Sequence, residues 1–182
     1  MVVLGIDPGS YVTGYAFLST GDKGVRVLEY GSIACKTNVP FEDRLLHIIT
    51  ELEVLLEQHK PQVLSMESAF FAKNVKSAMI LGHVRGAILV TCKKRNMSFA
   101  EYSPRSVKLA VTGSGASSKE RVAQMVQTHL RLKQMEGPLD ASDALAIAWT
   151  ELAPPPVVAK APKHKGKNDM RKLILKMGGT LP

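Results

Sequence analysis

Four acidic residues lie at the ends of segments that the sequence predicts to be buried. Asp7 and Glu67 each end an apolar run typical of a strand, while Asp140 and Asp143 begin the helical segment 139–152. Spaced three residues apart, the last two share one helix face. Carboxylates repel one another unless a cation joins them, so convergence of these four side chains predicts a divalent metal site.

One reaction that such a site can catalyse is phosphodiester hydrolysis. Oxygen ligands select Mg2+ or Mn2+ over zinc. Two ions about 3.5–4 Å apart activate a water, shield the phosphate and stabilise the leaving oxygen. We therefore expect two Mg2+ ions, replaceable by Mn2+, with Asp7 bridging them from a central strand and Glu67 holding one from the next strand. The positive end of the last helix's dipole would face the same ions.

Asp140 and Asp143 also allow an interpretation without metal. Asp140 could be the N-cap of its helix, with Asp143 as the acidic residue three positions later, which is a capping arrangement. The two roles can coexist.

Periodicity predicts the elements that must position these residues. Three strands in an antiparallel meander are followed by alternating helices and strands, which predicts an α/β fold with a mixed five-stranded sheet and helices on both faces. The expected strands are Val2–Asp7, Val12–Ser19, Val25–Cys35, Gln62–Glu67 and Ser98–Ser103, and the expected helices are Phe41–His59, Asn74–Arg95, Pro104–Val111, a helix to Leu130 with Ser117 and Glu120 as capping box, and Leu139–Leu152.

Composition fits one domain with a basic tail. The 182 residues are 45% hydrophobic, which suffices for a single core over residues 1–152. No uninterrupted apolar run approaches the ~18 residues of a membrane span. Met1 begins a strand rather than a cleavable leader, so we expect a cytoplasmic protein that binds no membrane. Cys35 and Cys92 form no CxxC pair and are expected to be buried without a disulfide or metal.

The charge is concentrated at the C-terminal end. Of the net +8, the segment 153–182 carries seven Lys or Arg against one acid, Asp169, which leaves +2 for the body. Once cations neutralise the four carboxylates, the body is basic too. This balance favours a phosphate-bearing partner, although an ordinary basic cytosolic protein has the same charge.

An ordered set of motifs resembles the RuvC family of Holliday-junction resolvases. The motifs run over residues 1 to about 152 and are, in order, Gly5-Ile6-Asp7-Pro8-Gly9-Ser10 with Val12-Thr13-Gly14-Tyr15, Glu67 with Phe70-Phe71-Ala72-Lys73-Asn74, Leu81-Gly82 with Arg85-Gly86, Val107-Lys108, Gly113-Ser114-Gly115 with Lys119, and Asp140-Ala141-Ser142-Asp143-Ala144-Leu145-Ala146. Each motif alone is weak, but the set is specific. The resemblance implies an RNase H-like fold, a homodimer, a branch-migration helicase complex as partner, and Mg2+-dependent nicking of four-way DNA junctions.

Four further residues are candidates for DNA contact. Lys119 is expected in the first turn of a helix, where the dipole disfavours a cation, so phosphate binding explains it better than helix stability does. Lys108 is a candidate because the resemblance implies a DNA contact at this position. Phe70 lies in a loop just after Glu67 with Lys73 close behind, an arrangement that suits stacking on an unpaired base. Packing of the phenylalanine against the domain, and ordinary solvated lysines, are the alternatives.

The predicted helix 74–95 carries Ala78, Gly82 and Gly86 at four-residue intervals. Glycine inside a helix costs about 1 kcal/mol relative to alanine, which favours close approach of another backbone. That neighbour is either the domain's own central helix or a second subunit, and the resemblance favours the dimer. In the tail, the helical spacing of Met170–Met177 leaves docking as an alternative to mobile phosphate contacts.

These observations favour a dimeric nuclease that resolves four-way junctions by paired nicks, leaving 5′-phosphate and 3′-hydroxyl ends. One alternative is an RNase H-like nuclease acting on structured RNA, similar to the YqgF-like family, whose first strand ends in the same kind of turn. A second is a non-catalytic nucleic-acid-binding protein, which the presence of all four carboxylates argues against.

Overall fold

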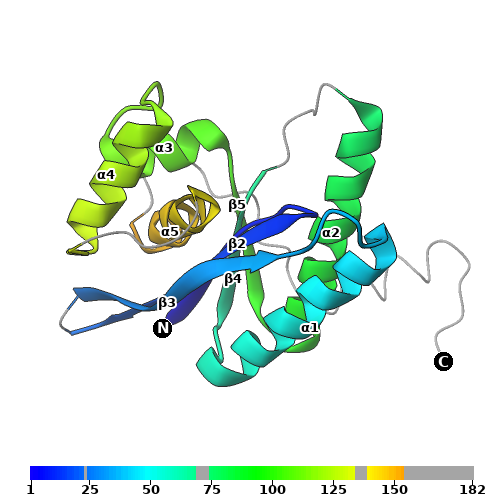
Figure 1. Ribbon diagram of the computed structural model, residues 1–182. Helices are drawn as coiled ribbons and strands as arrows, with labels where there is room; N and C mark the ends of the chain where they lie inside the picture. The colour runs from blue at the N-terminus through cyan, green and yellow to red at the C-terminus, as the bar shows by residue number, and fades with distance from the viewer. Residues whose placement is uncertain (23, 69–73, 134–138, 154–182) are drawn as a thin grey trace, which may run out of the picture.

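A single mixed sheet with helices on both faces forms the molecule (Figure 1), and the computed structural model describes residues 1–22, 24–68, 74–133 and 139–153 of it. The strands are β1 (Val2–Asp7), β2 (Val12–Gly21), β3 (Gly24–Ala34), β4 (Val63–Glu67) and β5 (Ser98–Tyr102). The helices are α1 (Phe41–His59), α2 (Val75–Lys94), α3 (Pro104–Thr112), α4 (Lys119–His129) and α5 (Leu139–Leu152). The predicted fold class and element order are confirmed, and bounds differ by at most two residues.

The sheet has the strand order β3-β2-β1-β4-β5. β1 pairs antiparallel with β2 and parallel with β4, so the first strand occupies the centre. β4 in turn pairs parallel with β5. The parallel strands β1 and β4 therefore end at the same edge, with Asp7 and Glu67 as their last residues.

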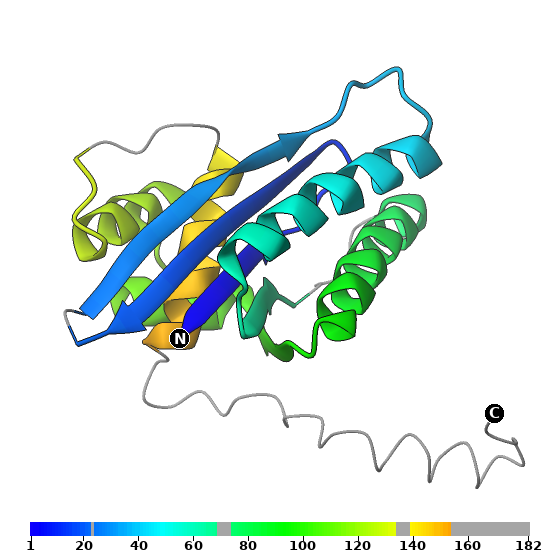
Figure 2. The same ribbon diagram turned by 90° about the horizontal axis from the view of Figure 1, so that it is seen from below.

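Helices α1 and α2 cover one face of the sheet (Figure 2). The inward positions of α1, Ile48, Leu52 and Leu56, are buried against Leu4 and Phe17 of the central strands, as the periodicity predicts. This burial of a whole helix face supplies most of the stabilisation of α1 on the sheet, at roughly 1.5–3 kcal/mol for each large side chain.

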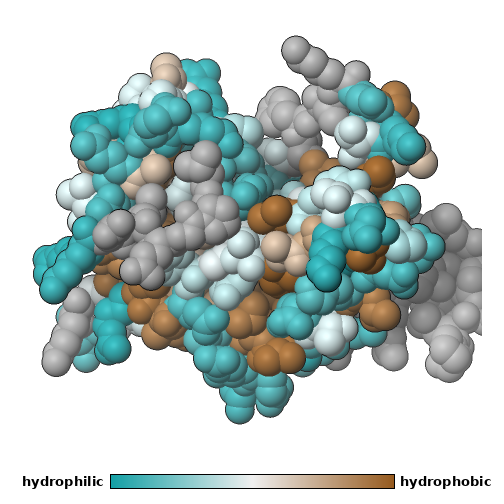
Figure 3. Space-filling view, viewed as in Figure 1, coloured by the Kyte–Doolittle hydropathy of each residue, from teal (hydrophilic) through white to brown (hydrophobic). Residues whose placement is uncertain are grey.

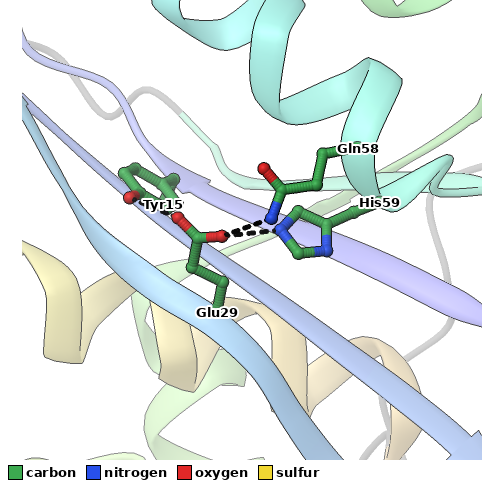
Figure 4. Close-up of polar contacts among 4 residues, drawn as sticks. All are labelled: Tyr15, Glu29, Gln58 and His59. Carbon is green, nitrogen blue, oxygen red and sulfur yellow. Dashed lines mark hydrogen bonds and ion pairs between the residues drawn. The ribbon is translucent and has the colours of Figure 1, made fainter.

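A polar cluster fixes the C-terminal end of α1 to the edge strand (Figure 4). Glu29 of β3 accepts hydrogen bonds from the Tyr15 hydroxyl at 3.0 Å and the Gln58 side-chain amide at 3.2 Å, and its other contact is His59 Nε2 at 2.8 Å. Burial and the adjacent carboxylate raise the pKa of Tyr15 to about 12, so its hydroxyl remains a donor. The cluster thus satisfies polar groups where α1 lies over the sheet.

The opposite face is covered by α3, α4 and α5, and α5 lies directly on the strands. Its residues Ala144, Leu145 and Ala148 are fully buried, and the Ser65 hydroxyl of β4 donates to the Ile147 carbonyl at 3.2 Å. Small residues on α5 and on the strands permit the close approach of the helix to the sheet. The last described helix is therefore packed on the first strand.

The outer side of α2 is apolar and exposed. Val75, Met79 and Val90 are 75%, 61% and 55% exposed, and Figure 3 shows hydrophobic side chains reaching the surface over this part of the molecule. Added Cβ atoms at Gly82 and Gly86 would meet no described atom within 4 Å. The neighbour that these glycines predict is therefore not another described element of the same chain.

By length and composition, α2 is also the one helix of the described chain that could cross a membrane. Core helices of soluble proteins and signal sequences share this length and composition, so these two properties alone do not place α2 in a membrane. The expectation that the protein binds no membrane stays an expectation.

The start of α4 corrects the predicted capping box. The helix begins at Lys119, and its N-cap is Ser118, whose hydroxyl accepts from the Arg121 amide at 3.3 Å. The Ser117 hydroxyl lies 2.7 Å from that of Thr112 and is used in the preceding turn. The pairing of Ser117 with Glu120 was therefore wrong by one residue.

Candidate active site

Strand alternation places Asp7 and Glu67 on the α5 face of the sheet. Gly5 lies against the backbone of α5 and Ser65 donates to it, so both residues face that helix. Residues two positions further along each strand point the same way, and these are Asp7 and Glu67. Because Ile6 is in register with Met66, the two carboxylates emerge side by side.

The first turn of α5 lies over the same place. Asp7 pairs with Gly14 of β2. A Cβ atom added to Gly14 would be only 2.5 Å from the Asp140 carbonyl carbon, so the two backbones are almost in contact. Asp140 is the second residue of the helix rather than its N-cap, because α5 already begins at Leu139. The capping interpretation of Asp140 is therefore wrong, although its charge still suits the helix N-terminus.

The four predicted carboxylates are close enough to influence one another electrostatically. Burial, followed by the charges of Asp143, Glu67 and Asp140 in that order of size, raises the pKa of Asp7 to about 7. Burial and then Asp143 raise the pKa of Glu67 as well. At neutral pH the site thus holds a carboxylate on which binding of a proton or a metal cation is favourable.

Lys119 lies at this cluster. Its Nζ is 3.0 Å from Asp143 Oδ2, with the lysine side chain 73% and the aspartate 27% exposed. This hydrogen bond, with the attraction of Asp143, Asp7 and Glu67, raises the pKa of Lys119 and keeps it charged. Lys108 of α3 is close enough to lower the pKa of Glu67. Both predicted lysines therefore face the carboxylates.

The donor chemistry of the cluster fits a divalent cation. Four carboxylates supply only oxygen atoms, the donors that Mg2+ and Mn2+ prefer. No three His, Cys, Asp or Glu side chains among residues 1–22, 24–68, 74–133 and 139–153 are drawn together closely enough to hold a metal ion as they stand. Coordination of an ion by this set would require the carboxylates to rotate toward one another. Phe70 and Lys73, also predicted at this edge, lie outside the described residues.

Two arginines that the sequence did not single out as site residues support the strand ends. Arg85 of α2 donates through Nη1 to the Glu67 carbonyl oxygen at 2.5 Å and through Nη2 to Glu101 at 2.5 Å. Arg44 of α1 donates through Nε to the Ser10 carbonyl at 2.9 Å, which fixes the turn after Asp7. Arg85 appears in the sequence analysis only as part of the Arg85-Gly86 motif. No local sequence pattern identifies Arg44 as a residue that supports the site.

The chain is similar to proteins of one known family over nearly all of its described residues. Residues 3–151 match the sequence profile of the family described as crossover junction endodeoxyribonuclease RuvC. The protein of that name from Chloroherpeton thalassium is 46% identical over 148 residues, covering 81% of this chain and 80% of its own. The protein of the same name from Caldicellulosiruptor saccharolyticus is 40% identical over 153 residues, which cover 84% of this chain and 92% of its own.

Solved structures give the same result. Thermus thermophilus RuvC in complex with a Holliday junction substrate has a TM-score of 0.78 and 32% identity, covering 84% of this chain and 93% of its own. The yeast mitochondrial Holliday junction resolvase, at 18% identity and a TM-score of 0.59 over 81% of this chain and 75% of its own, shares the fold.

Proposed function

This chain belongs to the RuvC family of crossover junction endodeoxyribonucleases, and from that premise we propose how its own residues cut DNA. The protein is a metal-dependent endonuclease that resolves Holliday junctions. The observation that carries the assignment of its active site is the convergence of Asp7, Glu67, Asp140 and Asp143, with Lys119 paired to the last of them.

We propose that these four carboxylates hold two Mg2+ ions in each subunit, which Mn2+ can replace. Such ions would activate water for attack on the phosphodiester and neutralise charge on the phosphate and the leaving oxygen. Asp7 would be the central ligand, since it is buried and repelled by all three partners, so a bound cation would relieve the most repulsion there. Cleavage leaves 5′-phosphate and 3′-hydroxyl ends.

We propose that Lys119 and Lys108 bind phosphate oxygens of the DNA. Lys119 is charged, mostly exposed and tied only at its tip to Asp143, so its ammonium group can move a short distance to a phosphate oxygen. Lys108 approaches from α3. By resemblance, Phe70 stacks on an unpaired base at the crossover and Lys73 contacts the backbone beside it.

We propose that α2 forms a homodimer interface. Val75, Met79 and Val90 are exposed on it, and Gly82 and Gly86 leave open space for a second backbone. Two subunits, each nicking one of two strands of like polarity, account for symmetric resolution. Met79→Glu should give monomers in sedimentation, whereas Val54→Glu, an equally exposed valine on α1 at 61%, should remain dimeric. Dimeric Met79→Glu would exclude this interface.

The location of the enzyme, its protein partner and the role of its C-terminal segment are also proposals. We propose that the enzyme works in the cytoplasm with a branch-migration helicase complex, and that the segment 153–182, which carries seven of its cations, adds phosphate contacts outside the nuclease domain.

The test is a substrate comparison with the purified protein. A four-way junction, a duplex of the same sequence and a structured RNA are incubated with Mg2+, with Mn2+ or with EDTA. Paired nicks near the junction centre, dependent on metal and lost in Asp7→Asn, are expected. Cleavage of the RNA in preference to the junction would favour the YqgF-like alternative, and binding without cleavage would favour a non-catalytic role.

A further inference from the structure

Gly14 occupies a position in which no side chain fits. It stands opposite Asp7 in the β1–β2 ladder, and the space where its Cβ atom would be is filled by the backbone of Asp140, with the carbonyl carbon at 2.5 Å and the Asp140 Cβ at 3.2 Å. Its backbone φ is not positive, unlike that of Gly24 and Gly113 among the described glycines. The requirement for glycine here is therefore space and not conformation.

Gly5 allows the same close approach further along α5. An added Cβ there would be 2.6 Å from the Ala148 amide nitrogen and 2.8 Å from the Ala148 Cβ. The nearest atom to that Cβ is the Ala144 carbonyl oxygen, four residues after Asp140 or about 6 Å along the helix at 1.5 Å per residue. The two glycines thus fix the height of α5 above the sheet at separate points, and Gly14 is the one that lies beneath Asp140 itself.

We infer that Gly14 is a positioning residue that sets the distance between the carboxylates of α5 and those of the strands, and thereby the affinity of the site for divalent cations. The inference rests on the proposed metal site. Relief of the overlap requires movement from 2.5 Å to an ordinary contact of at least 3.4 Å, a shift of about 1 Å. Backbone cannot rotate out of the way as a long side chain can, so the first turn of α5 itself must rise.

A shift of that size matters for coordination. Mg2+ demands near-ideal oxygen positions at about 2.0–2.1 Å, and functional sites tolerate displacements of roughly 0.5 Å. Asp140 and Asp143 both lie in the part of α5 that would rise, whereas Asp7 and Glu67 stay with the strands. The ligand set would be divided into two halves held too far apart.

The experiment compares Gly14→Ala with Gly5→Ala in the full-length protein. Each variant is melted in EDTA, and Mn2+ affinity is then measured by titration calorimetry at a temperature where both are folded. We expect Gly14→Ala to bind Mn2+ at least about tenfold more weakly than wild type, the range found for residues that support metal ligands. Gly5→Ala should lose thermal stability but lose clearly less Mn2+ affinity than Gly14→Ala, since its overlap is with Ala144 and Ala148, the nearer of which is about 6 Å along the helix from Asp140.

A compensating change separates positioning from general damage. In the Gly14→Ala background, Asp140→Glu lengthens the ligand by one methylene and should recover at least about threefold of the lost affinity, while Asp140→Glu alone should lower it. A general packing defect predicts no such recovery.

The outcomes distinguish this inference from the proposed function. If wild type binds no Mn2+, the metal site itself is wrong. If wild type binds and Gly14→Ala binds equally well, or if both glycine variants lose affinity equally, the role of Gly14 is wrong. A Gly14→Ala protein that stays unfolded even with trimethylamine N-oxide, which favours compact states, would assign the glycine to the fold and also overturn the inference.

Discussion

Asp7→Asn should stabilise the protein in the absence of metal. Burial and three neighbouring carboxylates raise the pKa of Asp7 from 3.8 to about 7. Each pKa unit corresponds to about 1.36 kcal/mol, so the ionised side chain destabilises the native state by about 4 kcal/mol above pH 7. Asparagine has nearly the same shape without the charge and should remove most of this effect.

The stabilisation should depend on pH in a defined direction. Below pH 3.8 the side chain is neutral in both states, and the variant has no advantage. Between pH 3.8 and about 7 the unfolded state ionises while the folded state keeps its proton, so wild type loses stability as pH rises. The advantage of Asp7→Asn should therefore be about 1.5 kcal/mol at pH 5 and about 4 kcal/mol at pH 8.

Thermal melting in EDTA at these two pH values measures the effect. For a protein of this size, 4 kcal/mol corresponds to a Tm increase on the order of 10 °C. Saturating Mg2+ should then stabilise wild type and leave the variant almost unchanged, because the amide brings no charge to the cation. Asp22→Asn, in the exposed β2–β3 turn, is the control and should show no such dependence. A less stable Asp7→Asn protein in EDTA at pH 8 would refute the proposed crowding of carboxylates.

Three further changes test the site and the tail. Asp140→Asn should fold normally in EDTA but lose junction cleavage, and wild-type nicking by this variant would rule Asp140 out as a ligand. Phe70→Ala should still bind junctions but resolve them slowly, since stacking contributes about 1–3 kcal/mol per base, and full activity would exclude that role. Truncation after Ala153 should preserve folding and low-salt cleavage while flattening the slope of log affinity against log salt by at least about two, as each phosphate contact contributes about 0.9. An earlier melting transition with an unchanged slope would instead indicate that the tail docks.

Local sequence was sufficient to predict the elements and their order. Apolar runs ending in Asp7 and Glu67 define the strand ends, while the parallel pairing that brings these ends to one edge is a finding of the structure. The start of α4 was misjudged because Ser117 and Ser118 are both good N-caps. The choice between them depends on Thr112, which takes the first hydroxyl into the preceding turn.

The supports of the site could not be predicted, because they depend on contacts between distant segments. Arg85 reaches the end of β4 from an adjacent helix, and Arg44 reaches the turn after β1. Nothing in either local pattern distinguishes them from solvated arginines. Gly14 was read as part of a motif, and its role became visible only when the backbone of Asp140 was found above it.

The packing of α5 on β1 also has a consequence for synthesis of the protein. The ribosome makes β1 first and α5 last among the described elements, yet these two carry Asp7 and the aspartates Asp140 and Asp143. A growing chain, or one released by premature termination before α5, holds only half of the carboxylates and cannot form the site. On the proposed assignment of the site, an unfinished chain therefore lacks nuclease activity. The same long-range pairing gives the fold a high contact order, which predicts slow folding relative to helical proteins of this length.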